Sequence, residues 1–425
     1  MSSGRLASVG VRRKIALAAR RAEGHSTRFD GTSGIGSLGS SAVSTTLDLR
    51  IPTQLLPRDG RFGCGPSKIR PEAVAALAAT GTSFLGTSHR QSPVKDQVGR
   101  LRSGLRHLFA LPDGYDVLLG NGGSTAFWDI ATFGLINERS QHLVFGEFSS
   151  KFAEASAAAP FLQQPEIIAA EPGTSARSIA RPDSHDNAAA GIDTYCLTHN
   201  ETSTGVATTI TRPAGASDDQ LVLVDATSAA GGLCVDPSQF DAYYFAPQKC
   251  LASDGGLWIS LCSPRALARI AAVKASGRWI PASMDLTIAV DNSTKNQTYN
   301  TPALATIFLA AEQIDWINAN GGLSWAAARS AESSGHLYDW ATARSFATPF
   351  VAEPTDRSGV VATIDLDGVD ALTVSAILRA NGIVDTDSYR KLGRNQMRIA
   401  TFPSVDPDDI RALTNCIDWV VEHLL

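Results

Sequence analysis

Two oppositely charged side chains follow short apolar runs in the middle of the chain. Leu221–Val224 is rich in leucine and valine, which predicts a buried strand, and Asp225 comes directly after it. A second apolar run, Asp241–Ala246, leads into Pro247-Gln248-Lys249 and so places a lysine at the end of a neighbouring strand. Open α/β sheets bind ligands beyond the carboxyl ends of their strands, so we expect Asp225 and Lys249 to share one crevice.

An acid and an amine in one crevice suit the chemistry of pyridoxal 5'-phosphate. Its aldehyde is held covalently by a lysine, and its ring nitrogen stays protonated beside a carboxylate so that the ring can accept electrons. The alternative is an ordinary surface lysine and a strand-end aspartate. The spacing of Asp225 and Lys249 alone favours this alternative, because short motifs often match by chance.

A glycine loop follows another predicted strand. In the segment DVLLGNGGST, residues 116–125, a strand ends in glycines and is followed by helical periodicity over Ala126–Ile136. Unpaired N–H groups and the positive end of the helix dipole meet at such a turn, so Gly123, Ser124 and Thr125 could hold a phosphate. The segment matches neither GxGxxG nor GxxxxGK[ST], which counts against a dinucleotide or nucleoside triphosphate.

Two further strand ends carry candidate side chains. His142–Gly146 predicts a strand that leads to Phe148, which could stack on a planar ring or, alternatively, belong to the core. Asp193–Thr198 predicts a strand that runs into HNETSTG, residues 199–205, a polar loop of the kind that lines sites.

Two segments between residues 62 and 90 add weaker evidence for a ligand site. FGCGPSK, residues 62–68, is a glycine-proline loop that lets backbone approach a ligand, although a plain turn is the favoured interpretation. His89 and Arg90 form a compact cationic pair suited to a phosphate or carboxylate, with a solvated pair as the alternative.

Composition limits the class of protein. The chain has 425 residues, 44% apolar and 19% charged, which predicts a soluble globular protein long enough for two domains. Its net charge of −5 gives no reason to expect nucleic acid or a membrane as partner, and no apolar run has transmembrane length. The six cysteines show neither CxxC spacing nor pairing with nearby histidines, so we expect no metal and no disulfide framework, and a reduced cytoplasm fits best.

Three regions are predicted along the chain. Residues 1–48 are rich in Ser, Gly, Ala and Arg and predict a disordered extension, with a transit peptide or an upstream start codon as alternatives. Residues 49–320 predict a large domain with a mostly parallel, doubly wound sheet, because strands and helices alternate through residues 116–261. Residues 321–425 predict a smaller α+β domain, to which the N-terminal segment of the large domain contributes. Its expected elements are a helical region over Ala303–Ala343 broken at Gly321-Gly322, strands at Val360–Leu366, Ile383 and Gln396–Ala400, and helices at Asp370–Ala380 and Pro407–Leu424.

From about Ile51 to Leu425 the chain resembles the phosphoserine aminotransferases, in particular their actinobacterial form. This is a branch of the class-V aminotransferases, which are fold-type I pyridoxal-phosphate enzymes. The blocks that carry the resemblance occur in the family's order: PRDGRFGCGPSK, GTSHRQSPVK, GNGGSTAFWD, HNETSTGV, DAYYFAPQK, KNQTYNTPA and GRNQMRIATFP. Several weak motifs now agree on one site, which reverses the preference for an ordinary surface lysine.

The resemblance implies roles for particular residues. Lys249 would bind the cofactor's aldehyde and Asp225 its ring nitrogen, Phe148 would stack on the ring where many relatives have Trp, and Thr202 would lie near the ring hydroxyl. The cofactor's phosphate would be held by Gly123, Ser124, Thr125 and Gln248 and, from the second subunit of a homodimer with shared active sites, by Asn300 and Thr301.

The resemblance also implies substrate contacts. Arg90 and Arg398 would bind the substrate's carboxylates, Arg398 its α-carboxylate, and His89 would assist at the distal anion. The chain departs from better-known relatives by having Ser124 in place of an arginine and Tyr389-Arg390-Lys391 in place of a His-Arg pair. We expect Arg390, Lys391 or Arg394 to hold the distal phosphate instead.

The activity that the resemblance implies is phosphoserine transamination: O-phospho-L-serine and 2-oxoglutarate give 3-phosphooxypyruvate and L-glutamate. This reaction belongs to L-serine biosynthesis, and a second role in pyridoxine biosynthesis stays open. The alternatives are an alanine–glyoxylate type transaminase, a cysteine desulfurase or a silent scaffold. Cys250 is misplaced for a desulfurase, and Lys249 with Asp225 counts against a scaffold.

Overall fold

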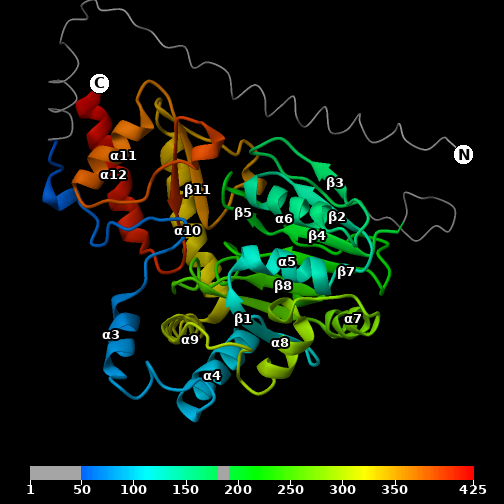
Figure 1. The fold of residues 1–425 in the computed structure, drawn as a ribbon. Coiled ribbons are helices and arrows are strands. Elements are labelled where there is room, and N and C mark those ends of the chain that lie inside the picture. The colour runs from blue at the N-terminus through cyan, green and yellow to red at the C-terminus, as the bar shows by residue number, and fades with distance from the viewer. Residues whose placement is uncertain (1–48, 180–190) are drawn as a thin grey trace, which may run out of the picture. The chain divides into compact units, whose positions relative to one another are not determined.

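A seven-stranded sheet forms the centre of the fold (Figure 1). The computed structural model describes residues 49–179 and 191–425. Within them, β9 is the one strand of this sheet that runs in the opposite direction to the others. The predicted mostly parallel α/β sheet is confirmed. The strands, in order across the sheet, are β1 (Asp116–Gly122), β9 (Gly256–Cys262), β8 (Ala242–Phe245), β7 (Leu221–Asp225), β4 (Thr194–Thr198), β2 (Ser140–Val144) and β3 (Glu166–Ala169).

Helices cover both faces of this sheet, and the alternation of side chains along β7 shows why. Leu221 and Leu223 belong to one apolar cluster and Val222 and Val224 to another, since successive side chains of a strand point to opposite faces. Strands buried on both faces are continuous apolar runs. The first cluster includes residues of α5 (Ser124–Gly134), α6 (Glu147–Ala158), α7 (Pro264–Ala275) and α8 (Leu286–Ser293), and the second includes residues of α4 (Ser92–Leu108) and α9 (Leu304–Ala319).

A second, antiparallel sheet has its own apolar core. Its strands are β10 (Ala347–Pro349), β11 (Val361–Leu366) and β12 (Gln396–Ala400), with helices α10 (Gly322–Thr342), α11 (Ala371–Ala380) and α12 (Pro407–Leu424). Ile51 and Phe62 from the N-terminal segment are buried in this core. The described residues fall into one compact unit, so the domain boundary between residues 320 and 321 stays a prediction. The predicted extension over residues 1–48 lies outside the described residues.

Shorter elements complete the chain. A hairpin pairs β5 (Asn200–Glu201) with β6 (Val206–Ala207), and α3 (Pro71–Ala79) precedes α4. The 3-10 helices are η1 (Thr53–Leu55), η2 (Pro237–Gln239), η3 (Ala282–Met284), η4 (Pro354–Asp356) and η5 (Arg390–Leu392). Of the helices in the described residues, none is long and apolar enough to cross a membrane.

Most predicted boundaries agree with these elements, but the strand predicted at Ile383 is wrong. Ile383 lies outside every strand, and the next residue, Val384, makes only an isolated bridge to Arg61. The chain has positive φ angles at Gly382 and Asp385, 84° and 64°, and these turn it before a ladder can continue.

Candidate active site

A cavity of about 360 Å³ lies where β4, β7 and β8 end. Its volume is within the range of small-molecule sites. The predicted site residues that line it are Gly123, Ser124, Thr125, Phe148, Thr202, Asp225, Gln248, Lys249 and Arg398. The structure thus brings together residues that are distant in sequence and that the resemblance assigned to one cofactor and one substrate carboxylate.

Lys249 is buried at this cavity, with 7% of its surface exposed. Its Nζ donates a hydrogen bond to Thr202 Oγ1 at 2.9 Å and lies 5.3 Å from the centre of the Phe148 ring. Burial lowers the pKa of Lys249 to about 8, while the Cys64 thiol opposes this shift and the Arg398 cation adds to it. A larger fraction of this amine is therefore neutral and nucleophilic near pH 7 than for an ordinary lysine.

Asp225 has a fixed orientation at the end of β7. Its Oδ2 accepts a hydrogen bond from Trp128 Nε1 at 2.9 Å. Its Oδ1 accepts from the backbone N–H of Thr227 at 3.0 Å and from the Thr227 hydroxyl at 2.6 Å. Thr227 Oγ1 also lies 2.6 Å from Ser124 Oγ, so the aspartate is connected to the glycine loop.

The glycine loop brings a helix N-terminus to the cavity. The α5 helix begins at Ser124, and no side chain within the described part of the chain caps it at Gly123. A Cβ at Gly123 would meet no described atom within 4 Å, so the space in front of the loop is open. Free N–H groups at such an end bind anions. Gln248 Oε1 is buried at the same cavity and has no hydrogen-bond partner among the residues described.

Phe148 lies in the first turn of α6 and not at a strand end, because β2 ends at Val144 and α6 begins at Glu147. The buried carboxylate of Glu201 holds this turn: it accepts hydrogen bonds from the backbone N–H groups of Phe148 and Ser149, at 3.1 and 2.9 Å. Glu201 therefore fixes the position from which the Phe148 ring faces the cavity.

Arg398 reaches the cavity from β12. Its guanidinium lies 5.3 Å from the centre of the Tyr389 ring, and its Nη1 donates to the backbone oxygen of Thr202 at 3.2 Å. The Nε of Arg398 is buried and finds no partner in the described residues. This guanidinium has donors available for an anion.

Four other predicted residues do not line this cavity: His89 and Arg90 contact the segment 297–301, to which Asn300 and Thr301 belong. His89 Nδ1 lies 3.1 Å from Thr301 Oγ1, and Arg90 Nη1 donates to Gln297 Oε1 at 2.9 Å. Asn300 follows in the same arm, residues 297–301, and lines a different, smaller cavity of about 70 Å³. The predicted anion-binding pair and the predicted phosphate arm therefore form one unit, separate from their own chain's Lys249 cavity.

The three candidates for the distal phosphate also lie outside the cavity. Lys391 forms an ion pair with Glu147 and lines a neighbouring cavity of about 250 Å³, whose lining also includes Tyr389. Arg394 pairs with Asp365, and Arg390 is exposed in η5.

Several residues at the cavity were not predicted. Trp128 is one helical turn after Ser124, a spacing that places both on one face of α5, so periodicity could have indicated it. No comparable sequence pattern indicated that Tyr389 or Thr227 would lie at the cavity. The loop over residues 62–68 was interpreted as a plain turn, yet its Gly65 packs on Lys249, where a Cβ would lie 2.8 Å from Lys249 Cε.

The fold and this site define the class of protein. Residues 65–386 match the family described as aminotransferase class-V, and the chain belongs to this family. It is 63% identical over 378 residues to the phosphoserine aminotransferase of Nocardioides sp. (strain ATCC BAA-499 / JS614), covering 88% of this chain and 99% of that one. It is 60% identical over 383 residues to the putative phosphoserine aminotransferase of Mycobacterium avium (strain 104), covering 90% and 100%.

Solved structures with the same fold include aminotransferases of several specificities. A phosphoserine aminotransferase from Cytophaga hutchinsonii superposes with a TM-score of 0.75 at 21% identity, covering 85% of this chain and 99% of that one. An aspartate aminotransferase from Thermus thermophilus gives a TM-score of 0.71 at 24% identity, covering 86% and 99%. The predicted fold, that of the fold-type I aminotransferases, is confirmed, but the fold alone does not select a substrate.

Proposed function

We propose that the protein is a phosphoserine transaminase of L-serine biosynthesis, which converts O-phospho-L-serine and 2-oxoglutarate to 3-phosphooxypyruvate and L-glutamate. The observation that carries this is a buried lysine facing an oriented aspartate in one cavity, in a chain 63% identical to a phosphoserine aminotransferase. The aspartate aminotransferase from Thermus thermophilus is only 24% identical, so aspartate is less well supported as the substrate than phosphoserine.

The residues at the cavity fit pyridoxal 5'-phosphate. Lys249 would bind the aldehyde, Asp225 would face the ring nitrogen, and Phe148 would lie against the ring. The backbone N–H groups at the start of α5 would donate to the phosphate group. Gln248 lines the same cavity and would donate to it through its amide NH2 group. When bound, the group supplies an electron sink for the bond that breaks at the substrate's Cα.

The chain's own side chains would then orient the substrate and move one proton. Arg398 binds the α-carboxylate through donors that are free in the described part of the structure. The Lys249 amine would act as the general base that takes the proton from the substrate's Cα and as the acid that gives it back. Burial keeps water from competing for that proton and keeps a neutral amine available at physiological pH.

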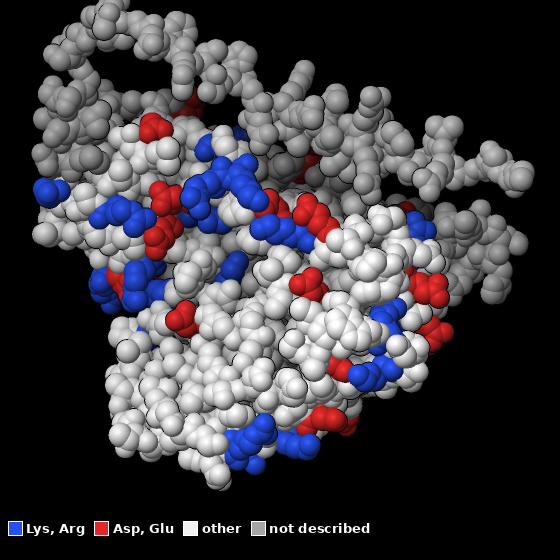
Figure 2. Space-filling model, viewed as in Figure 1, with Lys and Arg blue, Asp and Glu red and all other residues white. Residues whose placement is uncertain are grey.

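A homodimer with shared sites explains the unit formed by His89, Arg90 and the 297–301 arm. These residues contact one another and do not line their own chain's cavity, so we propose that they serve the cavity of a second copy, with Asn300 and Thr301 at the cofactor's phosphate. Figure 2 shows a broad area without charged side chains over α3 and α9. The exposed apolar side chains of Val74 and Leu85, 49% and 43% exposed, suit a surface that another copy covers.

The distal phosphate needs a cation beyond Tyr389. Of Arg390, Lys391 and Arg394 we favour Lys391, because it lines the cavity that shares Tyr389 with the Lys249 cavity.

All six cysteines are free, which supports the cytoplasm as the compartment.

The test is a panel of half-reactions. Purified protein loaded with pyridoxal 5'-phosphate is mixed separately with phosphoserine, glutamate, alanine and serine, and the loss of the bound cofactor's absorbance is followed. We expect fast reactions with phosphoserine and glutamate and rates about 100-fold lower with alanine and serine, because the site's cations would be left unpaired. A fast reaction with alanine and a slow one with phosphoserine would instead favour the alanine–glyoxylate type.

A further inference from the structure

A loop from the N-terminal part of the chain forms one wall of the cavity. In this loop, residues 62–68, the backbone N–H of Ser67 donates to the Gln248 oxygen at 2.8 Å, and the Ser67 hydroxyl donates to the Lys249 oxygen at 2.6 Å. Gly65 packs so closely on the lysine that a Cβ would lie 2.8 Å from Lys249 Cε. The loop therefore contacts both the backbone and the side chain of Lys249.

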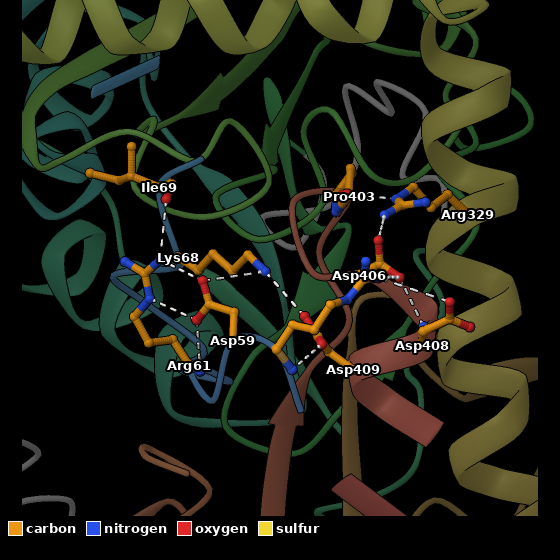
Figure 3. Close-up of polar contacts among 10 residues, drawn as sticks. Asp59, Arg61, Lys68, Ile69, Arg329, Pro403, Asp406, Asp408 and Asp409 are labelled. Carbon is orange, nitrogen blue, oxygen red and sulfur yellow. Dashed lines mark hydrogen bonds and ion pairs between the residues drawn. The ribbon is translucent and has the colours of Figure 1, made fainter. Parts of the chain in front are cut away.

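The last residue of this loop, Lys68, connects it to the start of α12. Figure 3 shows the Lys68 side chain between Asp59 and Asp409. Its Nζ lies 3.4 Å from Asp409 Oδ2 and 3.5 Å from Asp59 Oδ2, and only 8% of its side chain is exposed. The other oxygen of Asp409 accepts the backbone N–H of Arg58 at 2.8 Å. Three segments of chain, at residues 58–59, 68 and 409, therefore meet at one small group of charges.

The charges in this group are held by more than one contact. A hydrogen bond from Arg61 lowers the pKa of Asp59 to about 2. Asp409 is 2% exposed and belongs to the first turn of α12, where a carboxylate is stabilised by the helix dipole. A buried ion pair adds little net stability, because desolvation offsets its attraction, but it does fix the relative position of its partners.

We propose that Lys68 is a positioning residue for Lys249, and that its ion pairs with Asp59 and Asp409 hold the 62–68 loop against the reactive amine. The coupling is direct, because Lys68 is covalently adjacent to Ser67, whose two hydrogen bonds fix the backbone of Gln248 and Lys249. A shifted loop would admit water beside Nζ and misplace the amine. This inference rests on the proposed role of Lys249.

The test compares Lys68→Met with Arg58→Met. Both changes remove one positive charge beside the start of α12, but the Arg58 side chain is 74% exposed, and it approaches Asp406 and Asp408 only at 3.5 and 3.9 Å. The Met variant of Arg58 also keeps the backbone hydrogen bond to Asp409. It is therefore the matched control for charge.

The first readout needs no activity. Full-length protein freed of cofactor is treated with an amine-reactive reagent over a range of pH, and modification of Lys249 is measured by peptide mass spectrometry. We expect a midpoint near pH 8 in the wild type and in Arg58→Met, since burial holds the pKa of Lys249 at about 8. In Lys68→Met we expect the midpoint to rise by about one unit, because a hydrated ammonium is favoured. An unchanged midpoint in Lys68→Met would overturn the proposal.

The second readout separates positioning from folding. In the loaded enzyme we expect Lys68→Met to lower kcat about tenfold or more with KM little changed, whereas Arg58→Met leaves both unchanged. Lys68→Met/Asp409→Asn removes one charge of each sign, so that no unpaired carboxylate is left at position 409. If this double variant regains the wild-type midpoint and kcat, Lys68 only neutralises Asp409 and the proposal is wrong; persistent defects in a folded double variant support it. Failure of the proposed function would appear separately, as turnover by Lys249→Ala.

Discussion

The Lys249 amine combines deep burial with a lowered pKa, and both follow from its place after β8. Cys64, Arg398 and Asp225 line the same cavity and act on the charge of this amine, and the carboxylate of Glu201, outside the cavity lining, acts on it as well. Desolvation is the largest of these influences, so the lysine's environment depends on how tightly the cavity walls pack.

Replacing this lysine should separate chemistry from folding. We expect Lys249→Ala to lose transamination by at least about four orders of magnitude, because the proton-transfer group and the covalent attachment are both removed. Folding should persist, since truncation also removes a buried amine whose desolvation is unfavourable. Turnover and the circular dichroism spectrum are the two measurements, and wild-type turnover in the variant would contradict the assignment.

The pH dependence of cofactor capture should follow the same group. The pKa of Lys249 is lowered to about 8, so the amine is protonated and unreactive below that pH and neutral above it. We expect the rate at which cofactor-free protein binds pyridoxal 5'-phosphate to rise with pH up to about 8 and then to level off. A rise that continues to pH 10 would show that the amine is not desolvated in solution.

The hydrogen bonds of Asp225 lead us to expect a large loss of rate in one variant and a smaller loss in another. Asp225→Asn should keep the cofactor but lower the rate about 10²–10³-fold, because a neutral amide does not stabilise a protonated ring nitrogen. Trp128→Phe removes only the donor to Asp225 Oδ2 and preserves most of the packing, so we expect a loss of about tenfold. Absorbance of bound cofactor and kcat are measured for each variant, and equal effects of the two changes would contradict this order.

At the scale of elements, the N-terminus of α6 depends on one buried acid. Glu201→Gln leaves a single acceptor where two oxygens now receive donors from Phe148, Ser149 and Ser203. We expect a loss of about 1–3 kcal/mol in the free energy of unfolding and weaker cofactor binding. Glu154→Gln, at an exposed position of the same helix, is the control and should change neither. Denaturant titrations and cofactor titrations provide the measurements.

Elements with strong local signals could be predicted from sequence, and those defined by distant contacts could not. The run over residues 221–225 and the break at Gly321, with a φ of 119°, are local features that matched the structure. Tyr389 and the Gly65 contact depend on segments that meet only in the folded chain. The strand at Ile383 was wrong because its partner is a single residue more than 300 positions away.

At the scale of the whole molecule, shared sites predict complementation between inactive chains. A Lys249→Ala chain is mixed with an Asn300→Ala/Thr301→Ala chain under conditions in which subunits exchange. If each arm serves the other copy's cavity, one site of a heterodimer collects both defects and the other collects neither, so activity should return to part of the wild-type level. No recovery in heterodimers shown to have formed would mean that each chain builds its own site.

The position of the N-terminal segment in the second core sets an order for biosynthesis. Ile51 donates its backbone N–H to Asn381 Oδ1, and Arg58 donates to Asp409 Oδ1, contacts that span 330 and 351 positions. A chain leaving the ribosome therefore exposes Ile51 and Phe62 long before their neighbours on α11 and α12 have been translated. The same segment leads into the loop that packs against Lys249, so the active site can be completed only when synthesis reaches α12. Nascent chains that end before α12 should therefore be inactive.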